Sequence, residues 1–171
     1  CDYTIDKLKK NNVSVIFVTH DVEEALRISD KIIVMREGQI LQVASPKNLY
    51  DYPISTYVAK LLGRVNQIEV FPDRNGQFKT PFGKVERMNV SKKPQDCKGK
   101  KYYCIIRPEY LGLDESGVKA KIINKFFHGS SWSYEVDIGQ KYPLLSIANL
   151  KEELEKNQII KINTNKKNIL I

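Results

Sequence analysis

The stretch that decides how the first part of the chain is interpreted is Val13-Ser-Val-Ile-Phe-Val-Thr-His20. Residues 13–19 form a β-branched and aromatic run without alternation, which is typical of a strand covered on both faces in a parallel sheet. Asp21-Val-Glu-Glu24 follows with the spacing of a helix capping box, and Asp21 is interpreted as the helix cap. Val22, Ala25, Leu26 and Ser29 line one face of that helix. This order of elements predicts an α/β fold for the first part.

Further elements follow outward from this stretch. A short helix is expected at residues 2–11, before the strand. Residues 31–36 and 39–44 predict two strands that form a hairpin around Glu37-Gly38. Ser45-Pro46 predicts the start of a helix that Tyr52-Pro53 interrupts, and residues 55–62 predict another that Gly63 ends.

The pattern changes after Asn66, where short strand-like runs are separated by turns. Arg74-Asn-Gly76 predicts a type I′ hairpin turn, because Asn-Gly tolerates positive φ angles. One helix is expected at residues 150–157. The predicted strands cover residues 67–71, 77–80, 85–90, 102–107, 118–127, 133–138, 144–148 and 159–163. Many short strands at even spacing favour a small closed barrel of the oligonucleotide/oligosaccharide-binding (OB) type. The expected domains are therefore residues 1–66 and 67–171.

Composition excludes several classes of protein. Of the 171 residues, 42% are hydrophobic and 28% are charged, which is sufficient for a core and argues against a disordered chain. No apolar run approaches the roughly 20 residues of a membrane-spanning helix, and the chain does not open with a secretory leader. Three cysteines without a CxxC pair argue against a disulfide framework or a zinc site and fit a reducing cytosol. No metal ligands are expected.

Basic charge is concentrated in the second part. Residues 1–66 carry nine basic and eight acidic side chains, whereas residues 67–171 carry nineteen and twelve. Five lysines crowd together: Lys92, Lys93, Lys98, Lys100 and Lys101. Such a cluster is more often a solvated loop than a binding site, but it leaves open a basic module that binds single-stranded nucleic acid by stacking bases on Tyr102 and Tyr103.

His20 is the one candidate for catalysis. It follows a predicted buried strand and precedes a helix N-terminus, and ligands of open α/β sheets bind at the carboxyl ends of strands. A helix N-terminus favours phosphate. Taken alone, a single histidine is more often structural. Glu23 and Glu24 are expected on the solvent-exposed face of the helix, and Asp30 is interpreted as structural.

A longer pattern surrounds His20. Its first part is Val18-Thr-His-Asp-Val-Glu-Glu-Ala-Leu-Arg-Ile-Ser-Asp30, and its second part is Ile33-Val-Met-Arg-Glu-Gly-Gln-Ile-Leu-Gln42. The pattern continues with Ala44-Ser-Pro46, Leu49-Tyr50, Pro53, Tyr57-Val-Ala59, Gly63 and Asn66. Residues 13–66 thus closely resemble the carboxyl-terminal end of the ATPase subunit of ATP-binding-cassette (ABC) importers. Residues 67–171 more loosely resemble the transport-associated OB (TOBE) domain of that family, through Arg107-Pro-Glu109, Gly129 and Tyr134-Glu-Val136.

The resemblance implies an α/β remnant of a nucleotide-binding domain followed by an all-β, OB-like regulatory domain. It identifies His20 as the switch histidine, which contacts the γ-phosphate of ATP. It also implies that the parent uses ATP and Mg²⁺, pairs with transmembrane subunits and a second ATPase copy, binds no nucleic acid, and lies in the cytoplasm on the inner face of the cell membrane.

The expected phosphate loop, signature motif and acidic magnesium/water pair are absent from the sequence. The chain is therefore interpreted as an amino-terminally truncated ATPase subunit, with no cofactor site and no hydrolysis of its own. Gly63-Arg-Val-Asn66 stands where the sugar-type importers carry Ser-Pro-x-Met-Asn, which favours iron, a polyamine or an oxyanion as the solute. The alternatives that remain are the nucleic-acid module and an anion-binding sensor domain.

Overall fold

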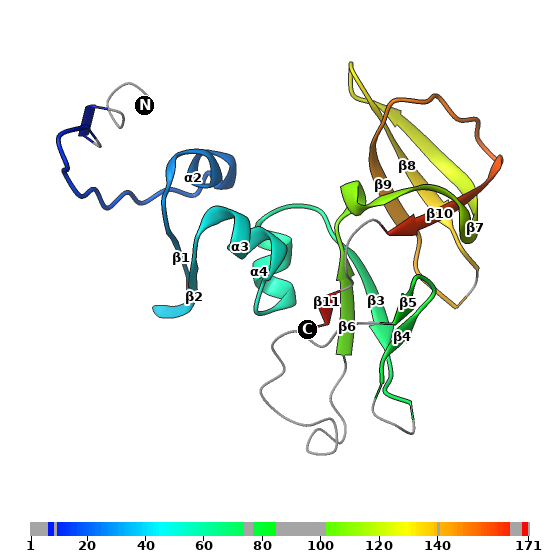
Figure 1. Cartoon of the computed structure of the whole chain (residues 1–171), viewed down its shortest axis with the longest axis horizontal. Helices are drawn as coiled ribbons and strands as arrows, with labels where there is room; N and C mark the ends of the chain where they lie inside the picture. The colour runs from blue at the N-terminus through cyan, green and yellow to red at the C-terminus, as the bar shows by residue number, and fades with distance from the viewer. Residues whose placement is uncertain are drawn as a thin grey trace. The chain divides into compact units, whose positions relative to one another are not determined.

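The computed structural model describes residues 7–8, 10–73, 77–84, 102–139, 141–164 and 169–170. The chain divides into two compact units, Cys1–Leu62 and Gly63–Ile171 (Figure 1). The predicted turn at residues 74–76 and the predicted strand at residues 85–90 lie outside the described residues, as does most of the predicted helix at residues 2–11.

Of the predicted helix at residues 2–11, the described residues 7–8 and 10 are helical. The next element is α2 (Val22–Ile28), whose N-cap is Asp21. The hairpin of β1 (Ile32–Arg36) and β2 (Gln39–Ala44) follows, and the two strands pair antiparallel. Glu37 and Gly38 at the turn have φ angles of 51° and 75°. Two consecutive positive φ angles are those of a type I′ turn, which matches the twist of the strands. The predicted cap and hairpin are both confirmed.

Two short helices cover one face of the hairpin. They are α3 (Pro46–Asp51) and α4 (Thr56–Leu61), and the Ser55 side chain caps the second by accepting from the Val58 N–H at 3.3 Å. The buried core of this unit consists of Val34, Leu49, Val58 and Leu62. Four buried side chains make a small core, so the stability of this unit depends on few contacts.

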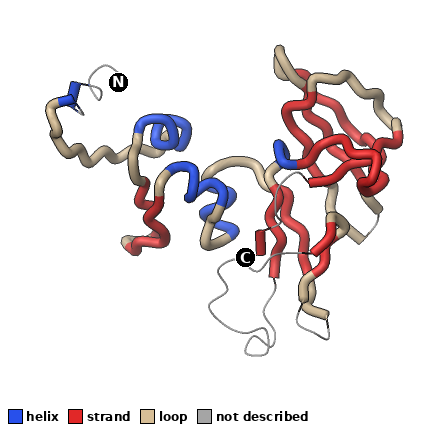
Figure 2. Tube along the Cα trace, viewed as in Figure 1, coloured by secondary structure: helices blue, strands red, loops and turns tan. Residues whose placement is uncertain are grey.

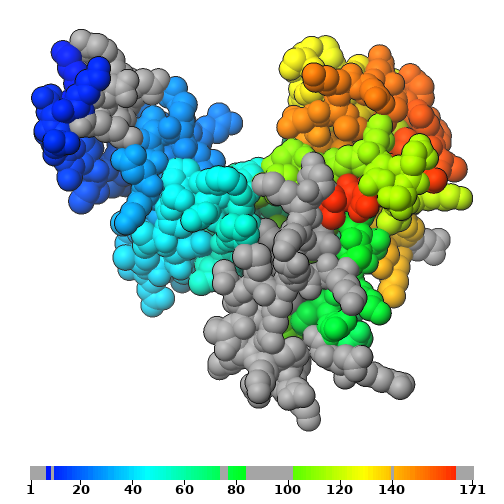
Figure 3. Space-filling view, in the orientation of Figure 1, coloured from blue at the N-terminus to red at the C-terminus, as the bar shows by residue number. Residues whose placement is uncertain are grey.

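The predicted strand at residues 13–19 is wrong for this chain. Residues 13–19 form no strand and are drawn as loop in Figure 2, and the blue segment to which they belong lies at the surface in Figure 3. Ile16 and Val18 are 95% and 91% exposed. A strand of this composition needs hydrogen-bonded neighbours at both edges and cover on both faces, and the described chain provides neither.

The second unit is built from two main antiparallel sheets (Figure 2). The larger has the order β10-β7-β8-β9, with β7 at Leu111–Phe127, β8 at Trp132–Asp137, β9 at Leu145–Leu150 and β10 at Ile159–Thr164. The smaller has the order β11-β6-β3, with β3 at Asn66–Val70, β6 at Tyr102–Ile106 and β11 at Ile169–Leu170. A two-stranded ribbon of β4 (Lys79–Thr80) and β5 (Gly83–Lys84) and a 3₁₀ turn, η2 (Pro108–Tyr110), complete the unit.

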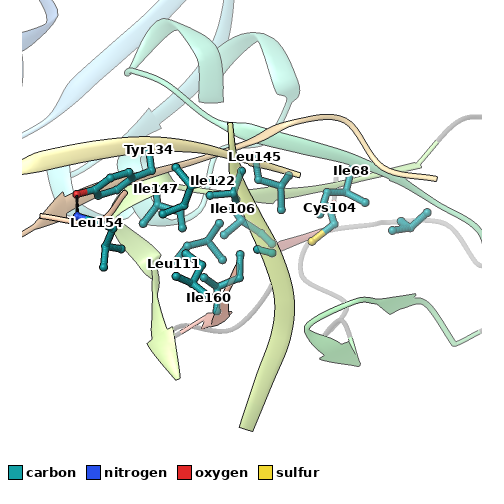
Figure 4. Close-up of a cluster of buried hydrophobic side chains, with 14 of the residues drawn as sticks. Ile68, Cys104, Ile106, Leu111, Ile122, Tyr134, Leu145, Ile147, Leu154 and Ile160 are labelled. Atoms are coloured by element: carbon teal, nitrogen blue, oxygen red, sulfur yellow. Dashed lines mark hydrogen bonds between the residues drawn. The ribbon is translucent and has the colours of Figure 1, made fainter. Parts of the chain in front are cut away.

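One core lies between these sheets (Figure 4). Its fully buried side chains include Ile68 of β3, Cys104 of β6, Ile122 of β7, Tyr134 of β8 and Ile147 of β9. Ile68, Ile122, Tyr134 and Ile147 alternate with more exposed neighbours along their strands, as expected for a sheet with one covered face. Cys104 differs, since the next residue on β6, Ile105, is also buried at 3% exposure. The mostly β-strand unit with its curled sheet is compatible with an OB-like barrel.

The predicted helix at residues 150–157 is wrong. Leu150 ends β9, and the residues that follow form a loop before β10. The hydroxyl of Tyr134 holds this loop, donating to the Glu152 carbonyl at 2.8 Å and accepting from the Leu154 N–H at 2.9 Å. The Tyr134 hydroxyl therefore binds two backbone groups that would form hydrogen bonds within the segment if it were a helix.

Candidate functional site

His20 lies in a tightly hydrogen-bonded turn at the start of α2. The Asp21 N–H donates to Thr19 Oγ1 at 3.0 Å, and the Glu24 N–H donates to Asp21 Oδ1 at 3.0 Å. The Asp21 carbonyl accepts from the Ala25 N–H at 3.1 Å and begins the helical ladder. The residues on both sides of His20 are therefore fixed, which restricts the direction in which its side chain leaves the chain.

The imidazole of His20 is exposed, and no hydrogen bond joins it to any residue among those the structure describes. Both ring nitrogens are thus available to an external group, as a phosphate-binding histidine requires. Glu23 is exposed, as predicted. Glu24 differs, since it is half-buried and its Oε2 lies 3.5 Å from Thr19 Oγ1. Asp30 is exposed ahead of β1.

Arg107, which carries part of the TOBE resemblance, is buried in the second unit with 2% exposure. Its Nη1 donates to the carbonyls of Gly63 and Arg64, both at 3.4 Å. Gly63 has a φ angle of 139°, a backbone conformation that favours glycine. Arg107 therefore holds the entry of the chain into this unit from within the core.

The two tyrosines expected to stack on the bases of a nucleic acid, Tyr102 and Tyr103, are not exposed in the structure. Tyr102 is only 8% exposed and packs against Phe78 with ring centroids 4.9 Å apart and ring planes at 55°, so its ring is not open to a base. Tyr103 is half-buried. The lysine cluster at residues 92–101 lies outside the described residues. Three exposed lysines do share a strand face, because Lys119 pairs with Lys161 and Lys121 lies two residues along the same strand.

A cleft of about 520 Å³ in the second unit was not anticipated by the sequence. Its lining combines one carboxylate with two lysines and two tyrosines: Gln67, Glu69, Val70, Phe71, Lys79, Tyr103, Lys141, Tyr142 and Pro143. These residues come from segments far apart in the chain, so no local spacing signals the cleft. Within the described ranges no group of three or more His, Cys, Asp or Glu side chains is placed to hold a metal ion.

No protein-family model matches the chain. The curated proteins that match most of it are ATP-binding subunits of ABC importers. The spermidine/putrescine import ATP-binding protein PotA of Mesomycoplasma hyopneumoniae is 36% identical over 132 residues, which cover 76% of this chain and 29% of the relative. PotA of Ureaplasma parvum is 34% identical over 163 residues, covering 91% and 30%. The Fe(3+) ions import ATP-binding protein FbpC of Fusobacterium nucleatum is 29% identical over 165 residues, covering 92% and 44%.

The chain thus spans less than a third of the length of these two PotA relatives. The similarity supports a general relationship to import ATPases. None of the helices in the described part of the chain is both long and apolar enough to cross a membrane.

Proposed function

We propose that the chain is the carboxyl-terminal portion of the ATP-hydrolysing subunit of an ABC import system, which couples ATP hydrolysis to solute uptake. The observation that carries this proposal is the homology with import ATP-binding subunits over up to 92% of the chain. The exposed His20 in its fixed turn agrees with it. Because most of each relative lies outside the matched segment, the parent supplies the remaining machinery.

In this proposal His20 contacts the γ-phosphate of ATP as the switch histidine. An imidazole N–H donates to a phosphate oxygen that gains charge in the transition state, and a donor that is already oriented needs little reorganisation. Thr19 and Asp21 act as positioning residues, since their hydrogen bonds fix the backbone on both sides of His20. Glu23 and Glu24 take no part in the reaction.

The described residues do not fit a complete site for ATP and Mg²⁺. They contain no cluster of three or more acidic or histidine side chains for a metal, and the sequence contains no Gly-Lys-Ser/Thr phosphate loop. ATP and Mg²⁺ are therefore bound by the parent outside this segment, and the chain alone is inactive.

The second unit is proposed to be a TOBE domain with a regulatory and dimerising role. The partners of the parent are then the transmembrane subunits and a second ATPase copy, on the cytoplasmic face of the cell membrane. The relatives named for spermidine/putrescine and for Fe(3+) support the polyamine and iron alternatives for the solute.

An exchange of segments tests the proposal. In the Mesomycoplasma hyopneumoniae relative, the matched segment is replaced by residues 1–171 of this chain, and ATP hydrolysis is compared with that of the relative lacking the segment. The proposal predicts turnover in the chimera and none in the deletion. A folded chimera that binds ATP but does not hydrolyse it would contradict the proposal.

A second candidate, a basic module for single-stranded nucleic acid, is favoured only by the shared face of Lys119, Lys121 and Lys161. Non-specific phosphate contacts weaken steeply with salt. Binding of an oligonucleotide that persists at physiological salt and is lost on Lys119→Glu would favour this candidate over the first.

A further inference from the structure

The cleft in the second unit has no role in the proposed function. Its volume of about 520 Å³ lies within the range of roughly 300–1,000 Å³ for pockets that bind small molecules. One side of it is the face of β3 and β6 that carries Glu69 and Tyr103, which pair directly across the two strands. Lys79 of β4 and residues 141–143, which precede β9, also line it. All of these segments belong to the second unit (Figure 1), and the site is called the β3 cleft below.

The charged groups of the β3 cleft favour an anionic ligand. Lys79 and Lys141 bring two ammonium groups to it, and Glu69 brings the one carboxylate of its lining. Both lysines are exposed, and neither forms an ion pair with another residue that the structure describes. Lysine ammonium groups bind phosphate and carboxylate oxygens, and an excess of positive charge attracts such ligands from solution.

Aromatic rings line the same cleft. Phe71 follows β3 and is 72% exposed, and Tyr103 and Tyr142 are half-buried, so part of each ring remains accessible. Aromatic side chains offer flat faces on which a planar ring stacks. Because these rings and the two lysines line one cleft, a ligand that carries both a planar ring and an anionic group matches them together.

Polar groups of β3 can bind the edge of such a ring. Gln67 and Glu69 lie two residues apart on one face of β3, and both line the cleft. The Gln67 amide both donates and accepts hydrogen bonds, and a carboxylate accepts them. The edge of a nucleobase carries both donors and acceptors. A planar, nitrogen-containing ring joined to an anionic group is the chemistry of a nucleotide.

We propose that the β3 cleft binds a nucleoside monophosphate. Lys79 and Lys141 bind the phosphate, and the base stacks on Tyr103 or Tyr142. The second unit then carries a nucleotide site separate from the one in which the parent hydrolyses ATP. This inference goes beyond the proposed function and does not rest on it, because it uses no residue of the first unit.

Equilibrium dialysis of the full chain against radiolabelled adenosine monophosphate tests this site at physiological salt. Adenosine and inorganic phosphate serve as competitors, and each carries only one of the two recognised groups. Displacement is therefore expected to require about tenfold or more of either competitor than of unlabelled adenosine monophosphate. Equal competition by inorganic phosphate would show an anion site that does not recognise the base, and would overturn the proposal. Far stronger competition by a single-stranded oligonucleotide would assign the cleft to nucleic acid and would also overturn it.

A matched pair of lysine variants separates the cleft from the general positive charge of the chain. Lys141→Ala is expected to weaken binding of adenosine monophosphate by about tenfold, because it removes one charge-assisted phosphate contact. Lys119→Ala removes the same charge from an exposed position on β7 outside the cleft, and is expected to leave binding unchanged. Equal losses in the two variants would contradict the proposal. Lys79→Ala, on a different segment, repeats the test, and urea unfolding followed by Trp132 fluorescence confirms that each variant is folded.

Two further variants locate the bound ligand. Tyr142→Ala is expected to weaken binding of adenosine monophosphate and to leave the weaker binding of inorganic phosphate unchanged, because it removes only a stacking face. His20→Ala is expected to leave binding of adenosine monophosphate unchanged. Binding that is lost in His20→Ala and retained in Lys141→Ala would place the phosphate at His20, which would overturn this inference and leave the proposed function standing.

Discussion

The side chain of Asn66 binds both backbone groups of Ser146, which lies on a different sheet. Its amide donates to the Ser146 carbonyl at 2.7 Å, and its oxygen accepts from the Ser146 N–H at 2.6 Å. Asn66 belongs to β3 and Ser146 to β9, the end strands of the two main sheets. One buried side chain thus acts in place of a strand pairing and joins the two sheets of the second unit.

Asn66→Ala is expected to destabilise the second unit by about 2–4 kcal/mol, because it leaves two backbone groups without their partner in a site that is 4% exposed. Urea unfolding of the full chain, followed by the fluorescence of its single tryptophan, Trp132, reports on this unit. Asn124→Ala is the control, since the half-buried Asn124 side chain donates to the Glu135 carboxylate at 2.8 Å and not to a backbone group among the described residues. Equal losses for the two variants would show that the link to Ser146 does not join the sheets.

Tyr134→Phe is expected to cost about 1–3 kcal/mol, because it removes both bonds that hold the loop after β9. Hydrogen exchange should quicken at the Leu154 amide, which loses its acceptor. Tyr142→Phe, at the half-buried edge of the cleft, should leave exchange at Leu154 unchanged. If Leu154 stays protected in Tyr134→Phe, then the hydroxyl is not what prevents a helix here.

Gly117→Ala is expected to destabilise the chain by about 1–3 kcal/mol, because an added Cβ would lie 2.2 Å from the Ile162 carbonyl oxygen of β10. Gly112→Ala in the same strand β7 is the matched control, since a Cβ there meets nothing within 4 Å. Thermal unfolding of the two variants is the measurement, and only Gly117→Ala is expected to lower the unfolding midpoint. Equal decreases in the midpoint for both variants would show that β7 tolerates alanine poorly in general, and would contradict the role of the close approach to Ile162.

Burial raises the pKa of the Cys104 thiol from 9.0 to about 12. The folded state therefore favours the protonated thiol, and this contribution to stability is complete below pH 9 and is lost as the pH rises toward 12. Cys104→Ala should show a smaller loss of stability than the unaltered chain between these pH values. Alkylation of Cys104 at pH 8 should require unfolding, and rapid labelling of Cys104 itself in the folded chain, located by peptide mapping, would contradict the assigned burial.

The sequence predicted correctly the elements that depend on residues close to one another in the chain. The Glu37-Gly38 turn and the Asp21 cap are specified by residues within a few positions of each other, and both form as expected. Residues 13–19 carry the composition of a strand, but a strand forms only when neighbours pair with it, so composition alone was misleading. The loop after β9 was missed for the same reason, because Tyr134 is distant in sequence.

The candidate site was only partly predictable. The position of His20 before a helix N-terminus followed from the sequence, and the structure places it in an exposed, hydrogen-bonded turn. The burial of Tyr102 was not predictable, because alternation along β6 does not reveal which side faces the core. The cleft and the bond from Asn66 to Ser146 depend on strands that meet only after folding.

The most direct test of the central claim is the effect of His20→Ala on the chimera, with ATP turnover and ATP affinity measured separately. Loss of a transition-state contact predicts a fall in turnover of about 100-fold or more with nearly unchanged affinity for ATP. His128→Ala is the matched control, since His128 is also exposed but bonds Ser133 Oγ at 2.7 Å in the second unit. Unchanged turnover in His20→Ala would show that His20 is a structural residue and would contradict the account.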